Sequence, residues 1–118
     1  MTEIKPRTPS YSETIKTEIV CPNDTNPVGI LMGGRLVEWM DVAAAVCAQV
    51  HTEQVCVTAM INKVAFRKPA KIGDVITIKA SITRAFRTSM EIKVTAAARN
   101  YLSGNQYDVS DVFFIFVA

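Results

Sequence analysis

Apolar residues between positions 33 and 51 recur on nearly every side of a helix instead of along one stripe. At about 100° per residue, Arg35, Glu38 and Gln49 fall close together and form a narrow polar edge. A helix this apolar is typical of one that other elements largely enclose. The pattern therefore predicts a long helix over residues 33–51 and a sheet that curves around it, because a flat sheet covers only one side.

Alternating apolar and polar residues predict strands on both sides of this helix along the chain. Residues 10–20 alternate partly, as an edge strand does. Alternation and β-branched residues recur in four later segments: 55–66, 74–86, 88–100 and 107–118. Short connections favour antiparallel pairing of consecutive strands from residue 55 onward. The 118 residues fit one α+β domain, in which we expect residues 1–9 to be a flexible N-terminal segment.

Asp41 interrupts the apolar helix. The residues one turn away are Val37, Glu38, Ala44 and Ala45, so no basic neighbour on the helix can pair with this carboxylate. Burying an unpaired carboxylate costs several kcal/mol. Two interpretations stay open at this point: Asp41 accepts hydrogen bonds from another element or subunit, or it carries out chemistry.

The glycine pair Gly33-Gly34 at the helix start also has two interpretations. The pair could simply begin the helix or let another part of the backbone pack closely. Alternatively, the missing Cβ atoms could let a substrate carbonyl reach the free N–H groups of the first turn, which would form an oxyanion hole. The pair lies two helical turns before Asp41, which makes the second interpretation more interesting.

Charge is unevenly distributed along the chain. Residues 1–61 carry a balance of −3 and residues 62–118 a balance of +5. The basic residues of the second half could bind phosphates, or they could be the solvated faces of ordinary strands. Nucleic acid is not expected as a partner, because the sequence has no series of stacking aromatic residues and no DNA-binding motif.

Composition also narrows the range of sites and compartments. The three cysteines match no metal or redox spacing and are predicted to be small buried thiols. With His51 as the only histidine, a multi-histidine metal site within one chain is excluded, and we expect no metal. The first residues are polar and no apolar run is long enough to span a bilayer, so we expect a cytoplasmic protein that does not bind membranes.

Motifs spread over residues 22–117 resemble those of the acyl-CoA thioesterases of the hotdog fold. The closest resemblance is to the YciA-like and cytosolic acyl-CoA hydrolase branch. The matching positions are Asn26, Gly29, Gly33, Gly34, Asp41, His51, Val57-Thr58, Phe66 with Pro69, Gly73-Asp74 and Thr88-Ser89-Met90.

This resemblance implies a long central helix wrapped by a curved antiparallel sheet of about five strands, and a homodimer that joins two sheets edge to edge. A trimer of dimers is a further option. The resemblance places the active sites at the dimer interface. It implies that Asp41 is the catalytic carboxylate, that Asn26 of the partner subunit orients the water or the thioester, and that the N–H of Gly33 or Gly34 polarises the carbonyl.

The same resemblance suggests where coenzyme A binds. Thr88 and Ser89, with Arg87 beside them, would lie along the coenzyme A channel. Among the other basic residues, Arg67 and Lys68 are expected to bind the phosphates of the coenzyme.

The acyl chain is expected in an apolar gap beside the helix, near Met40, Ala44 and Met60. The chain departs from the family pattern at Phe86, where relatives often have glycine. A ring at this position could narrow the coenzyme A channel or pack between subunits.

The implied activity is hydrolysis of an acyl-CoA thioester to a free carboxylic acid and coenzyme A, with no cofactor. Asp41 would act as a general base on water or attack the carbonyl directly. One alternative is a non-catalytic acyl-CoA-binding module on the same fold, for which a buried base has no purpose. A purely structural dimerisation domain is a third interpretation, for which the motifs are too many.

Overall fold

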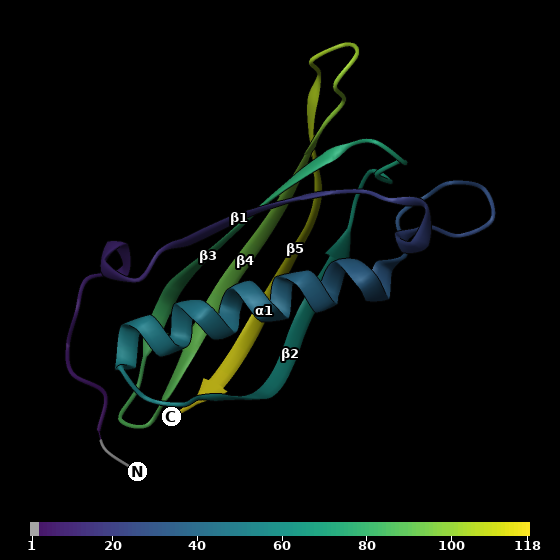
Figure 1. Cartoon of the computed structure of the whole chain (residues 1–118). Coiled ribbons are helices and arrows are strands. Elements are labelled where there is room, and N and C mark those ends of the chain that lie inside the picture. The colour runs from purple at the N-terminus through teal and green to yellow at the C-terminus, as the bar shows by residue number, and fades with distance from the viewer. Residues whose placement is uncertain (1–2) are drawn as a thin grey trace.

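The computed structural model describes residues 3–118 (Figure 1). These residues form one long helix, five strands and two short 3-10 helices. Their bounds are η1 Pro9–Tyr11, β1 Thr14–Ile19, η2 Pro22–Asp24, α1 Gly33–Thr52, β2 Val57–Phe66, β3 Val75–Ala85, β4 Ser89–Arg99 and β5 Gln106–Val117. The helix lies across one face of the curved sheet, as the helical pattern and the alternating segments predict. The α+β hotdog architecture is therefore confirmed.

The five strands form one antiparallel sheet in the order β1-β3-β4-β5-β2. As expected, β3 pairs with β4 and β4 pairs with β5. The expected pairing of β2 with β3 is wrong, because β2 pairs with β5 instead. The reason lies in the segment after β2, which binds the loop before α1 instead of turning back as a hairpin. Leu31 N–H donates to Ala70 O over 2.9 Å, and Ile72 N–H donates to Gly29 O over 3.1 Å.

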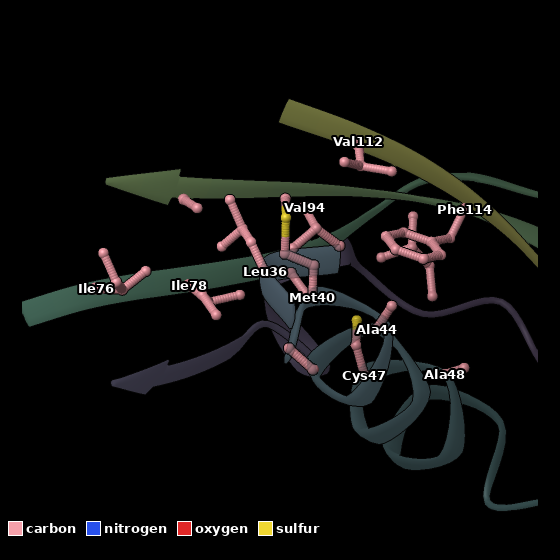
Figure 2. Packing of buried hydrophobic residues seen from close by; sticks show 14 of the residues in the cluster. Leu36, Met40, Ala44, Cys47, Ala48, Ile76, Ile78, Val94, Val112 and Phe114 are labelled. Carbon is pink, nitrogen blue, oxygen red and sulfur yellow. The ribbon is translucent and has the colours of Figure 1, made fainter. Parts of the chain in front are cut away.

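The core lies between α1 and the concave face of the sheet (Figure 2). Every second residue is buried along β4 and along β3 from Ile76 to Ile82, which is the period that a strand with one covered face requires. Met40 and Ala44 have no exposed surface, and Figure 2 shows them facing Val94 and Phe114. Small residues along this side of the helix let the sheet approach closely.

The opposite side of α1 is open in the single chain. Val42, Val46 and Val50 are 49%, 43% and 45% exposed, so the prediction of a largely enclosed helix is wrong for one chain alone. One sheet, even a curved one, covers only the side of the helix that faces it. The open valines form an apolar stripe that nothing within residues 3–118 covers.

Strand β2 is the second exposed apolar element. It stands at the edge of the sheet, and most of its residues are exposed on both faces. Val57, Met60 and Phe66 are 61%, 53% and 56% exposed. A long apolar edge strand is a template for pairing with another strand.

The N-terminal segment crosses the C-terminal end of α1. Ile4 N–H donates to Arg87 O over 2.9 Å, and the Arg7 guanidinium donates to His51 O over 2.9 Å. The sequence predicts that residues 1–9 are flexible, and two of them, residues 1–2, lie outside the described residues. For residues 3–9 flexibility stays a prediction.

The cysteines follow the prediction only in part. Cys47 and Cys56 are buried, and burial raises the pKa of the Cys47 thiol. Cys21 is exposed, because it lies between β1 and η2, where its backbone N–H donates to the Asp24 carboxylate over 2.9 Å and its side chain faces solvent. Between residues 3 and 118, no helix is long and apolar enough to cross a membrane.

His51 is buried at the end of α1, where Ser12 Oγ lies 2.8 Å from its Nδ1. A neutral ring with its proton on Nε2 accepts this hydroxyl hydrogen. Burial lowers the pKa of His51 below its ordinary value, and the positive charge of Arg7 lowers it further. Protonation would turn Nδ1 into a donor and place a second charge near Arg7.

The fold should therefore lose stability in mild acid. Because the folded pKa of His51 is below the unfolded value of 6.5, its contribution is complete above that pH and is lost as pH falls toward the folded pKa. Melting temperatures measured from about pH 7.5 to about pH 5.5 should fall. In His51→Gln the fall should be smaller. An equal decline in both proteins would contradict this account.

Candidate active site

Asp41 lies half-buried on α1 and has a partner on the neighbouring strand. Thr58 Oγ1, at the start of β2, donates a hydrogen bond to Asp41 Oδ1 over 2.7 Å. A hydrogen bond from another element, which the first interpretation of Asp41 required, is thus present. Nothing between residues 3 and 118 donates to the second oxygen, Oδ2. One oxygen is held in place while the other can still accept a proton.

The helix start offers free donors. The first hydrogen bond of α1 runs from Leu36 N–H to Met32 O over 3.1 Å, and no side chain among residues 3–118 caps the helix start. The N–H groups of Gly33 and Gly34 have no acceptor in the described part of the chain. They lie at the positive end of the helix dipole, which favours a negatively charged oxygen.

The two glycines differ in their surroundings. A Cβ on Gly33 would lie 3.1 Å from Phe66 Cζ, so this position allows close packing. A Cβ on Gly34 would meet nothing within 4 Å, so the backbone there is open. Gly33 therefore fits the interpretation that the missing Cβ allows close packing. Gly34 fits the interpretation that the missing Cβ leaves the backbone accessible to a ligand.

Asn26 organises the loop before the helix. Its Oδ1 accepts hydrogen bonds from Val28 N–H over 3.0 Å and from Ile30 N–H over 3.1 Å. The side chain is exposed, and its amide nitrogen has no acceptor among residues 3–118. No hydrogen bond joins Asn26 to Asp41 within the chain.

The candidate groups divide between the two ends of β2. Asp41 and Thr58 lie beside the first residues of the strand, whereas Gly33 packs against Phe66 at its last residue. The loop of Asn26 leads into the same end as Gly33. One chain therefore holds the carboxylate and the helix-start donors apart.

The residues predicted to bind coenzyme A divide in the same way. Arg67 and Lys68 follow the end of β2, and the Arg67 guanidinium pairs with Asp111 over 2.9 Å. Arg87 and Thr88 precede β4, and Ser89 is its first residue. Ser89 is level with the start of β2, because it pairs with Val117, which pairs with Val57. The two groups thus lie at opposite ends of the sheet.

An apolar cavity of about 270 Å³ lies next to the helix start. Its lining residues are Ile30, Leu31, Gly33, Leu36, Phe66, Arg67, Lys68, Pro69, Ala70 and Val109. The expected acyl gap near Met40, Ala44 and Met60 is wrong for the single chain. Met40 and Ala44 have no exposed surface because the sheet packs directly on them, and Met60 lies open on β2.

Thr58 is the residue that the sequence interpretation missed. Thr58 and its neighbour Val57 match positions of the family pattern. Their spacing in the sequence did not show that Thr58 contacts Asp41, which lies 17 positions earlier on the helix. Within the described residues, no group of three His, Cys, Asp or Glu side chains could hold a metal ion.

Comparisons with known proteins point to one family. The family model described as Thioesterase superfamily matches residues 28–100. The acetyl-coenzyme A thioesterase of Mus musculus is 37% identical over 106 residues, which are 90% of this chain and 19% of that protein. The chain thus spans about one fifth of that relative.

Solved structures with the same fold are more similar in length. A hexameric acyl-CoA thioesterase superposes with a TM-score of 0.92 at 35% identity, covering 95% of this chain and 72% of the other. An acyl-CoA hydrolase from Staphylococcus aureus, in complex with butyryl coenzyme A and coenzyme A, has a TM-score of 0.90 at 31% identity, with 95% and 68% covered. That hydrolase has also been solved with one aspartate, one asparagine or one threonine replaced by alanine.

Alanine at the two glycines should affect stability differently. At Gly34 the new methyl group meets no atom, and losing the freedom of glycine in the unfolded chain should stabilise the fold by about 0.4–1 kcal/mol. At Gly33 the methyl group must displace the Phe66 ring, so Gly33→Ala should gain less or lose stability. Thermal unfolding of both variants tests this order, and a more stable Gly33→Ala would contradict it.

Proposed function

The chain belongs to the thioesterase superfamily, and from this premise we propose that it hydrolyses acyl-CoA thioesters to free carboxylic acids and coenzyme A. The observation that carries the proposal is the Asp41 carboxylate, which Thr58 holds by one oxygen while the other stays available. We place the activity in the cytoplasm, where the free thiols of Cys21, Cys47 and Cys56 are maintained.

The Staphylococcus aureus hydrolase supports this choice of residues. Its substituted asparagine, aspartate and threonine are separated by the same intervals along the chain as Asn26, Asp41 and Thr58 are here. The same three residue types therefore occur at the same spacing in two chains with the same fold. This agreement adds Thr58 to the proposed site, as the residue that positions the carboxylate.

A second copy of the chain would complete the site through β2. Two β2 strands pairing antiparallel would bring the first residues of one against the last residues of the other. Asp41 and Thr58 of one subunit would then lie opposite the helix start and Asn26 of the partner subunit. The same contact would cover exposed apolar residues of β2 such as Val57 and Phe66, which removes apolar surface from water.

The same pairing brings the proposed coenzyme A contacts together. Arg87, Thr88 and Ser89 lie level with the start of β2, and Arg67 with Lys68 lie at its end. Antiparallel pairing places the first group beside the partner's second group. The basic side chains would bind the phosphates, so binding should weaken as salt rises.

Catalysis follows from these positions. Asp41 takes a proton from water as the water oxygen bonds to the carbonyl carbon, and the N–H groups at the helix start donate to the oxygen that becomes negative. Breaking the C–S bond then releases coenzyme A as a thiolate, which takes up a proton. Direct attack by Asp41, with an anhydride as intermediate, would use the same groups.

A trimer of dimers would need a second contact surface. The outer face of the sheet carries an apolar strip beside the edge strand, formed by Val57, Met60, Phe113, Ile115 and Val117. This strip is continuous with β2, and we assign the contact between dimers to it. The hexameric thioesterase of the same fold supports an assembly of that size.

Asp41→Asn should lower kcat on the best acyl-CoA by about 10²- to 10⁴-fold, as expected for loss of a general base. The amide keeps an acceptor for Thr58, so the fold and the assembly should survive. Glu38→Gln is the matched control, because Glu38 is an exposed carboxylate on the same helix. Release of free thiol measures the rate. Near-normal turnover by Asp41→Asn, or binding of acyl-CoA without turnover by the unmodified chain, would contradict the assignment.

Sharing of the site can be tested by mixing subunits. Asn26→Ala and Asp41→Asn should each be weakly active alone, whereas a mixed dimer has both changes in one site and none in the other. Mixed dimers should therefore regain one working site of two. If subunit exchange is demonstrated and activity does not recover, Asn26 and Asp41 act within one chain or not at all.

A further inference from the structure

The cavity beside the helix start suggests which part of the substrate it receives. We propose that this cavity binds the acyl chain and that Phe66 limits its length, so that the chain prefers short and medium acyl groups. The inference rests on the proposed thioesterase function, because it assumes that a thioester carbonyl binds at the helix start. It concerns the size of the substrate and not the chemistry of the site.

The walls of the cavity fit an acyl chain better than the amide-containing arm of coenzyme A. Leu31, Leu36, Ala70 and Val109 are between 1% and 8% exposed and form its inner surface. The backbone N–H of Leu31 is already bound to Ala70 O. An amide placed there would lose its hydrogen bonds to water without finding new partners, which costs more than burying methylene groups.

The polar groups of the cavity lie at its outer side. Arg67 and Lys68 are exposed, and the Arg67 guanidinium is held by Asp111 over 2.9 Å. These charges suit the phosphate-bearing end of the substrate, which stays near solvent. The division between an apolar interior and a basic outer side matches a thioester whose acyl part is inside and whose coenzyme part is outside.

Phe66 forms the wall next to the reacting group. Its Cζ would lie 3.1 Å from a Cβ on Gly33, so the ring lies against the first turn of α1, where the free N–H groups are. The ring is also 56% exposed, so it separates the cavity from the open side of β2. An acyl chain that outgrows the cavity meets this ring.

The cavity volume sets the scale of the preference. The cavity measures about 270 Å³, and the Phe66 ring is one of its walls. A short or medium acyl chain fits within this space. A methylene group that a close-fitting apolar pocket cannot accommodate costs about tenfold or more in kcat/KM, so long chains are disfavoured.

The test is a profile of kcat/KM against chain length, from acetyl-CoA to palmitoyl-CoA, for four proteins. Phe66→Ala removes the ring and should raise the ratio of dodecanoyl to hexanoyl turnover by about tenfold or more. Ala70→Val fills the inner wall and should lower that ratio. Tyr101→Ala, an aromatic truncation in the β4–β5 loop, is the matched control and should keep the profile of the unmodified chain.

The outcomes separate this inference from the proposed function. If the unmodified chain hydrolyses acyl-CoAs and the profile is unchanged in Phe66→Ala and Ala70→Val, the acyl chain lies elsewhere and the inference is wrong. If the folded, unmodified chain releases no thiol from any acyl-CoA, the proposed function is wrong. Phe66 also lies on the strand that we propose to pair with a partner. The ratio of two kcat/KM values measured on one protein does not depend on the fraction that is assembled, so Phe66→Ala tests the inference even if Ala70→Val fails to fold.

Discussion

The structure depends on one constraint: a helix that is apolar on nearly all sides cannot be covered by one sheet. The sheet buries Met40, Ala44 and their neighbours, while Val42, Val46 and Val50 remain open. On another flank of α1, beside Asp41, stands β2, an edge strand with exposed apolar residues and an unpaired row of backbone groups. In the dimer that we propose, β2 is covered by the same strand of a second copy of the chain.

This constraint also explains why the candidate site is divided. Asp41 stands at the border between the covered and the open side of α1, where Thr58 can reach one of its oxygens. The helix-start donors lie at the other end of β2, beside Phe66. In the proposed dimer, the carboxylate and the helix-start donors of one chain therefore face the same interface from opposite ends. Closing the interface would exclude water from the site, which strengthens the electrostatic interactions there.

The sequence predicts the elements well and their long-range relations less well. Periodicity identifies the helix over residues 33–51 and all five strands because these patterns are local. It cannot show that β2 pairs with β5, because that choice depends on the loop after β2 binding the loop before α1. For the same reason Thr58 was missed, and the acyl gap was placed on helix residues that the sheet buries. The roles of Asn26 and the glycine pair came from resemblance, and spacing alone left them open.

Phe66 connects assembly with specificity. It is the last residue of β2, the strand that we propose to pair with a partner, and its ring also forms a wall of the cavity beside the helix start. A change that shifts the register of β2 by one residue would turn this side chain to the other face of the sheet. The ring would then leave Gly33, and the cavity would open beside the helix start. In the proposed dimer, the contacts that stabilise the assembly and the contacts that limit the acyl chain therefore lie on the same strand.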